Sequence, residues 1–599
     1  PHTTIYNYPD TTDINTIVVS SAASDVYKRK ALKIAQDCRR YDQDLFVVYL
    51  GNNDVLGPYG AGTVFQPLSG NRSLIRSSIA VKGTRLGQLL SSVGGSGVVG
   101  PESWGSLAMF LEHQVRADEP ALQTVYQHFE DNLRDIGDQA IRAGIPAVFC
   151  TVASNLRDTP PFASLHRVGM TGEEERRFGE LYRKGVEHEE KARYAEALGL
   201  YAKAAGIDDT YADLRFRIGR CQWLTENFAP ALENYHAARE YDTLRFRADA
   251  RINDTIRKVA GRRVGEGIHL VDVEDVFARQ SPHGAPGKEL FLEYVHLTFR
   301  GNYLLAKSVY DSTTPLLTEG GMTSRKSPPD ERECARRVAY PHWEEQKVVR
   351  NILHQQIMHP PFTNQLYSRE RIKRFEDNLK RLNQELSSAG RQDMEPGYRW
   401  ATEQAPGDHV LNYRYALFLR QWGQYEAAAR QFQQVVEAVP HHADAYNNLG
   451  IVSSKLGDLD RAVACYRKAV ALAPMHSTAS YNLGAVLQLQ GKLKPAERAY
   501  RSAIHADPRR PESYINLGLV LRDLGRPDEA LAAFREGLTF RPKNLWLHQQ
   551  SGLLHLQLGQ SKEAITAFQA ALEIDSDFAP AREALHQAYR DPLSWDQVK

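Results

Sequence analysis

The chain has 599 residues, of which 42% are hydrophobic and 25% are charged, and its formal net charge is +1. This balance argues against a protein that recruits nucleic acid through a strong positive field. No run of about 18 apolar residues occurs, so the sequence predicts no membrane-spanning helix. The five cysteines are scattered without metal-ligand spacing, and we expect neither a metal site nor a cofactor.

Residues 1–29 are predicted to be a leader that does not belong to the fold. Ser20–Arg29 read S-S-A-A-S-D-V-Y-K-R, a string that matches the translation of a common transposase sequencing adapter. We therefore expect a protein truncated at its N-terminus, whose own sequence begins near Lys30. An ordinary polar leader is the alternative.

Residues 30–320 are predicted to form a mostly parallel α/β domain with three layers. Asp44–Asp54 read D-L-F-V-V-Y-L-G-N-N-D, in which a β-branched and aromatic run flows into a polar turn. Ile145–Val152 and Ile268–Val273 are similar runs, and Val125–Ala143 is a helical stretch between strands. This alternation favours a parallel sheet whose ligands bind beyond the carboxyl ends of the strands.

A helical insert is predicted within this domain, at residues 172–258. Tyr194, Ala197, Tyr201 and Ala204 have helical spacing, and residues 211–238 repeat the theme. We expect about two degenerate helical repeats here, which cover the edge of the domain. Residues 321–405 are charged and helical in pattern, and they are predicted to link the domain to the C-terminal part of the chain.

Residues 406–599 are periodic, because four residue classes recur there at one constant interval. They are the glycines 423, 457, 491, 525 and 559, the prolines 440, 474, 508 and 542, the alanines 428, 462, 496, 530 and 564, and the aromatic residues 432, 466, 500, 534 and 568. The interval of about 34 residues and the residue types resemble the tetratricopeptide repeat, a helix-turn-helix unit that stacks into an all-α solenoid. We expect five repeats between about Asp408 and Asp575, followed by a helical cap.

Asn448, Asn482 and Asn516 share the same period on the predicted first helix of each repeat. First helices line the concave face of such solenoids, and an amide there can donate to and accept from a peptide backbone. The three residues resemble the asparagine ladder in the repeat domain of O-linked N-acetylglucosamine transferase. We predict a groove for a protein or peptide partner, with a solvent-facing helix residue as the alternative.

Two further motifs concern chemistry. G-N-N-D at residues 51–54 and V-H-L-T-F-R-G-N at residues 295–302 together resemble the SGNH (GDSL-type) hydrolases, in a bacterial subgroup that carries tetratricopeptide repeats. The resemblance implies that Asn53 is an oxyanion donor, that His296 is a general base, and that Glu293 orients His296. The block that would carry the nucleophilic serine is absent from the chain.

The sequence therefore favours an ester or acyl hydrolase, or an acyltransferase, fused to a protein-binding solenoid. Its substrate would be an acylated molecule, for example a carbohydrate, and the chain as it stands would be inactive. The alternative is a non-catalytic scaffold with a degenerate hydrolase domain. The compartment is left open between cytoplasm and periplasm.

Overall fold

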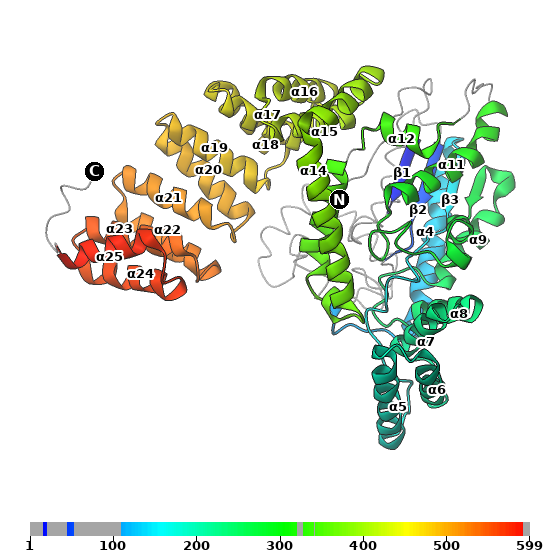
Figure 1. Cartoon of the computed structure of the whole chain (residues 1–599). Coiled ribbons are helices and arrows are strands. Elements are labelled where there is room, and N and C mark those ends of the chain that lie inside the picture. The colour runs from blue at the N-terminus through cyan, green and yellow to red at the C-terminus, as the bar shows by residue number, and fades with distance from the viewer. Residues whose placement is uncertain (1–15, 21–44, 53–109, 320–327, 341, 591–599) are drawn as a thin grey trace. The chain divides into compact units, whose positions relative to one another are not determined.

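The computed structural model describes residues 16–20, 45–52, 110–319, 328–340 and 342–590. The chain forms two compact units, residues 1–390 and residues 391–599. Helices make up most of the residues that the structure describes in each unit, as Figure 1 shows. The boundary lies inside one long stretch, α14 (Ser368–Gln404), where Gly390 has a φ of 63° and interrupts the helix.

A parallel sheet lies in the first unit. Its four strands are β1 (Thr16–Ser20), β2 (Leu45–Tyr49), β3 (Ala147–Cys150) and β4 (Ile268–Val271), and they pair in the order of the chain. All residues of β2 and β3 are buried, which explains their continuous apolar sequences. Val47 pairs with Val148, and Val148 in turn pairs with His269.

Two helices pack on this sheet in one apolar core. They are α4 (Ala121–Ala143) and α9 (Ala250–Gly261). Leu133 and Ile136 of α4 share the core with Ile256 of α9 and Phe149 of β3. The helix α9 falls at the end of the range predicted for the insert, but its apolar residues belong to the core around the sheet.

The insert consists of two helical hairpins between β3 and β4. The first is α5 (Gly172–Glu190) with α6 (Tyr194–Ala205), and the second is α7 (Ala212–Leu224) with α8 (Phe228–Glu240). A Cβ atom on Gly185 of α5 would lie 2.3 Å from the ring of Tyr201 on α6. The glycine therefore permits an approach between the helices that any side chain would prevent.

The remaining elements of the first unit follow β4, except η3, which directly precedes it. They are α10 (Val273–Arg279), α11 (Phe299–Glu319), α12 (Glu331–Arg337), α13 (His342–Ile352) and the short turns η3 (Val264–Glu266), η4 (Pro282–Gly284), η5 (Leu353–Ile357) and η6 (Phe362–Asn364). A second core joins α13 and the first half of α14 to the loops that flank the sheet. Val349, Leu382 and Tyr294 are buried in it.

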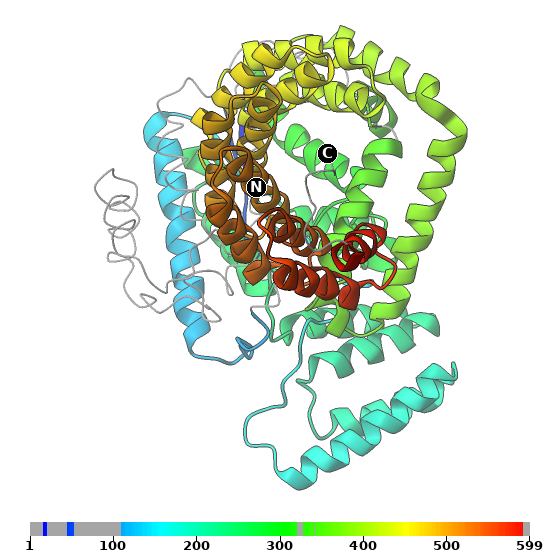
Figure 2. The ribbon, with the colours of Figure 1, turned by 90° about the vertical axis from the view of Figure 1, so that its left-hand side faces the viewer.

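The second unit is a curved stack of helix pairs (Figure 2). The pairs are α15 (His409–Gln421) with α16 (Tyr425–Ala438), α17 (Ala443–Lys455) with α18 (Leu459–Leu472), α19 (Ser477–Leu489) with α20 (Leu493–Ala506), α21 (Pro511–Asp523) with α22 (Pro527–Phe540), and α23 (Leu545–Gln557) with α24 (Ser561–Ile574). A last helix, α25 (Ala579–Arg590), packs on α24. The five repeats and the cap expected from the sequence are confirmed.

The periodic glycines form the turns inside the repeats. Gly423, Gly457, Gly491, Gly525 and Gly559 all have φ between 70° and 82°. This left-handed conformation is costly for residues with a Cβ atom, which explains why glycine recurs at this position.

The fold class expected for the first unit needs correction. Helical repeats, and not a three-layer α/β hydrolase domain, dominate the described residues, and the sheet has four strands of only four or five residues each. The β-branched runs predicted the strands, but much of the chain between β3 and β4 packs as helix on helix. Thr16–Ser20, within the predicted leader, pairs with β2 as β1; whether residues 1–29 are native stays a prediction.

Candidate functional site: the ladder of amides and the His296 pair

The first helices of the solenoid lie on the inner side of its curve. Successive first helices such as α17, α19 and α21 contact one another directly, although a second helix separates them in the chain. In a curved stack the inner elements lie closest together, so this contact identifies the inner face. The predicted ladder residues stand on these helices.

The three asparagines tie neighbouring repeats together. Asn448 Nδ2 donates to Tyr413 Oη at 3.0 Å, and Asn516 Nδ2 donates to Tyr481 Oη at 3.1 Å. Asn482 Nδ2 donates to Asn447 Oδ1 at 3.0 Å. Each bond spans 35 residues, so each crosses from one first helix to the first helix before it.

The acceptors were not recognised from the sequence, although they carry the same signal. Tyr413, Asn447 and Tyr481 recur with the period of the repeats, each one position before a potential ladder residue. The next member of this series is Ile515, whose side chain has no acceptor. This explains why the ladder of side-chain bonds stops before Gln550.

The ladder residues differ in their exposure. Asn448 is buried, donates a second bond to the Asp444 carbonyl at 2.8 Å and accepts one from Arg420. Asn482 and Asn516 are half-buried. Their predicted role in holding a partner is not tested by the structure.

An apolar stripe follows the ladder. Three residues after each ladder position, and hence on the same side of the helix, the first helices carry a half-buried residue that is apolar in all five repeats. The stripe consists of Leu417, Ile451, Ala485, Leu519 and Leu553.

The His296 pair lies in the first unit, in the loop before α11. Glu293 is buried, with an exposed fraction of 2%, and its carboxylate accepts the backbone N–H groups of Tyr294, Val295 and His296. His296 Nδ1 lies against the same carboxylate. Glu293, which the resemblance implied would orient His296, is thus in contact with it, but the catalytic roles of both residues stay a prediction. Asn53 lies outside the described residues.

Residues after β3 position this pair. Asn155 is buried, and its Nδ2 donates to the Glu293 carbonyl at 2.9 Å. Its Oδ1 accepts the backbone N–H of Asp158 at 2.8 Å, which closes a turn. Arg157 pairs with Glu289 and donates to Asp158 at 3.2 Å. These side chains hold together the loops around the His296 pair.

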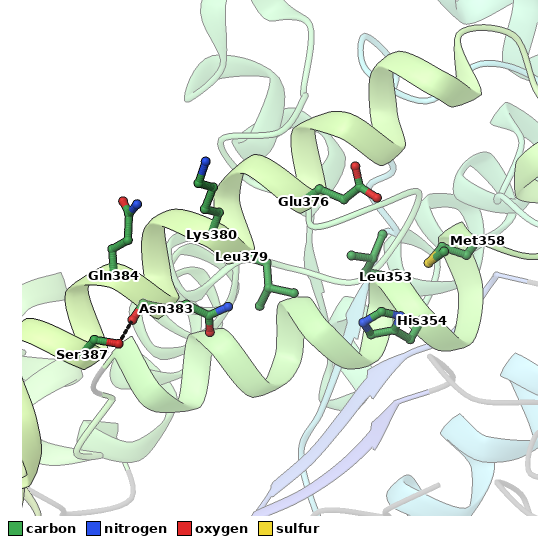
Figure 3. A pocket seen from close by; sticks show the side chains of 9 residues that line it. All are labelled: Leu353, His354, Met358, Glu376, Leu379, Lys380, Asn383, Gln384 and Ser387. Carbon is green, nitrogen blue, oxygen red and sulfur yellow. Dashed lines mark hydrogen bonds between the residues drawn. The ribbon is translucent and has the colours of Figure 1, made fainter. Parts of the chain in front are cut away.

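A separate groove lies between η5 and the first half of α14, with a volume of about 700 Å³. Figure 3 shows its two walls and nine lining side chains, which are Leu353, His354, Met358, Glu376, Leu379, Lys380, Asn383, Gln384 and Ser387. None of the site residues predicted from the sequence lines it. No group of three or more His, Cys, Asp and Glu side chains placed to hold a metal ion occurs among the residues that the structure describes.

The solenoid is a stack of tetratricopeptide repeats. Models of this repeat match residues 441–509, residues 416–453 and 487–544, and residues 547–578. A search of curated protein sequences found no match.

Solved structures of repeat proteins resemble the solenoid. MamA is 27% identical over 27% of this chain and 94% of its own chain, with a TM-score of 0.26. MamA from Desulfovibrio magneticus RS-1 is 24% identical over 28% and 96%, with a TM-score of 0.27. YrrB, described as a TPR protein with an unusual peptide-binding site, is 22% identical over 31% and 96%, with a TM-score of 0.28.

The assignment to the SGNH hydrolases is wrong. The family models that match are all tetratricopeptide repeats and lie within residues 416–578, and none is a hydrolase. The two phrases that suggested the family are short, and turns of this kind occur wherever a strand or loop of an α/β unit meets a helix.

Within the described residues, no helix is both long enough and apolar enough to cross a membrane.

Proposed function

We propose that the solenoid is a protein-binding scaffold that accepts an extended peptide along the inner face of its first helices. The observation that carries this proposal is the register of two rows on that face. Half-buried apolar side chains run beside a row of amides that side-chain bonds hold in place. Amides fix a peptide backbone by donating and accepting, and apolar positions take up its side chains.

The exposure of the ladder residues favours α19 and α21 as the centre of the proposed site. Asn482 and Asn516 are half-buried, while Asn448 is buried among its own partners. The partner is therefore expected to contact α19 and α21, beside Ala485 and Leu519. We expect this partner to be an extended peptide segment that carries apolar side chains.

Selection of random peptides against the whole chain, followed by affinity measurement, tests this proposal. Leu519→Lys is expected to weaken the selected peptides at least tenfold, because it places a charge in the apolar stripe. Ile574→Lys is the matched control: Ile574 is also apolar, has an exposed fraction of 37% and lies on α24, a second helix, away from the inner face. Equal affinity for both variants would place the binding site elsewhere.

We also propose that His296 and Glu293 form a proton-transfer pair. A buried carboxylate that faces Nδ1 fixes the imidazole in one orientation and one tautomer, as a positioning residue does for a general base. Nitrogen-15 NMR of neutral His296 should show a proton on Nδ1, and Glu293→Gln should remove this preference. A wild-type tautomer ratio equal to that of free histidine would remove the proposal.

A further inference from the structure

The insert has one side-chain bond in the same register as the ladder of the solenoid. Arg217 Nε on α7 donates to Tyr182 Oη on α5 at 2.9 Å, and the two residues are 35 apart. Arg217 stands two residues before Gly219, as Asn448 stands two residues before Gly450. The first helices of the insert, α5 and α7, therefore present the face that corresponds to the inner face of the solenoid.

A segment of the same chain lies on this face. Leu366–Glu370 runs from the loop after η6 into the first turn of α14, and it meets α5 and α7 through Tyr367. The Tyr367 hydroxyl donates to Glu189 of α5, and Arg217 Nη1 donates to the Tyr367 oxygen at 3.3 Å. The ring lies 6.2 Å from that of Phe216, the residue before the ladder arginine.

A second arginine of α7 contacts two side chains of the segment. The guanidinium carbon of Arg220 lies 3.9 Å from the centroid of the Tyr367 ring, within the range of a cation–π contact. Arg220 Nη2 also donates to Glu370 Oε2 at 3.1 Å. The face thus contacts an aromatic ring, its hydroxyl and a carboxylate three residues later.

The charges of the site suit a neutral phenol. Burial raises the pKa of Tyr367, so its hydroxyl keeps the proton that it donates. Burial alone would raise the pKa of Glu189 too, but Arg217 and the hydroxyls of Tyr367 and Tyr201 lower it below its ordinary value. The buried carboxylate therefore stays ionised and depends on these donors.

The backbone conformation of Tyr367 also indicates that contacts with its surroundings hold this residue in place. Its φ is 54°, in the left-handed region that non-glycine residues seldom adopt. Such a conformation persists only where surrounding contacts offset its cost. Here the contacts are those with the insert.

From these contacts we infer that the insert is a second peptide-binding module, which recognises a tyrosine followed three residues later by an acidic residue. Its ligand in this chain is the chain's own segment Leu366–Glu370, bound in cis. The module is distinct from the inner face of the solenoid, and it has the same first-helix face and ladder register. A peptide of this pattern from outside occupies the module only when the cis segment is displaced, because a tethered ligand acts at a high effective concentration.

The test uses the whole chain and a labelled synthetic peptide with the sequence of residues 361–372. A variant with both Tyr367→Ala and Glu370→Ala lacks the cis contacts, and we call it the vacated chain. The peptide should bind this chain at least tenfold more tightly than the wild type, as fluorescence anisotropy would show. Glu376→Ala is the control, because Glu376 is an exposed acidic residue of the same helix outside the contact, and this chain should behave like the wild type.

Recognition of the hydroxyl has its own control. A peptide in which phenylalanine replaces tyrosine should bind the vacated chain at least fivefold more weakly, because Glu189 then loses one of its donors. Equal binding of the original peptide to wild-type and vacated chains would overturn the inference. Equal binding of the two peptides would overturn the claim that the module recognises tyrosine.

Hydrogen exchange over residues 172–240 of the same samples separates folding from binding. If the vacated insert stays protected and the peptide does not bind, the inference is wrong. If the insert loses protection, the peptide should restore it, since a ligand stabilises the state that it binds. Failure to restore protection would also overturn the inference.

Discussion

At the scale of single residues, a glycine that faces an aromatic ring sets the distance between the two helices of a repeat. A Cβ atom on Gly484 would lie 2.8 Å from the ring of Tyr500, and one on Gly518 would lie 2.2 Å from the ring of Phe534. The interval along the chain from the glycine to the aromatic residue is the same in both pairs. The insert has this interval too, between Gly185 and Tyr201.

This close approach predicts the effect of one added methyl group. Gly185→Ala should destabilise the insert by about 1–3 kcal/mol, the usual cost of overpacking. Gly179→Ala on the same helix is the control: nothing lies within 4 Å of its added Cβ, so the higher helix propensity of alanine should leave stability unchanged or slightly raised. Hydrogen exchange of α5 and α6 in the whole chain measures both, and equal effects would contradict the prediction.

The side-chain bonds between repeats are a second feature at this scale. Asn516→Ala and Tyr481→Phe each remove one partner of the same bond, so a double-mutant cycle should show a coupling of about 0.5–1.5 kcal/mol. Denaturant unfolding of residues 391–599 measures it. Asn448 bonds to a different tyrosine, so Asn448→Ala should be nearly additive with Tyr481→Phe; a similar coupling there would mean that the bond does not act locally.

At the scale of the element, the first turn of helix α7 carries an acidic residue with a shifted pKa, Asp213. Burial raises the pKa of Asp213 from 3.8 to about 6, although Arg217 and Ser164 act in the opposite direction. The folded insert therefore binds this proton more tightly than the unfolded chain does. Ionising Asp213 destabilises the folded insert, so its free energy of unfolding falls as the pH rises from about 4 to about 6.

The sign of this effect gives a test of pH dependence. Relative to the wild type, Asp213→Asn should become more stabilising as the pH rises from 4 to 7, by about 1.4 kcal/mol for each unit of the pKa shift. Hydrogen exchange of α7, corrected for the intrinsic effect of pH on exchange, measures the difference. A difference that stays constant with pH would show that Asp213 ionises normally.

At the scale of the whole molecule, the second half of α14 completes the solenoid. Tyr398 is fully buried and stacks on Tyr415 of α15 at a centroid distance of 5.5 Å. Tyr398 also meets Phe418, at 5.0 Å. The terminal repeats of a solenoid need such a cover, because each repeat buries its apolar face only against a neighbour.

Two fragments test this cover. Residues 391–599 should fold alone and unfold at a higher temperature than residues 408–599, which lack Tyr398 and therefore expose Phe418. Circular dichroism against temperature measures both. With Tyr398 lost, the cost should be about 3–5 kcal/mol, the range for removing a buried aromatic side chain. Identical melting temperatures would show that α14 is only a connection.

The sequence by itself determined the solenoid. Its constant period predicts the repeats, because the same small, aromatic and turn residues must recur wherever identical helix pairs stack. The β-branched runs before Gly51 and Thr151 likewise predicted two strands of the sheet. The role of Glu293 in orienting His296 was implied only by the family resemblance; the two side chains are in contact, and the role stays a prediction.

Only the tertiary structure decided what these elements do to one another. Glu189, Arg217 and Tyr367 are far apart in the chain, and no local pattern joins them. The sequence shows the recurring ladder residues and their acceptors, but not the bonds between them, because a repeat fixes which positions recur and not which atoms meet. The hydrolase resemblance failed for the same reason: short turn phrases specify a local backbone, whereas a family is defined by how distant segments pack.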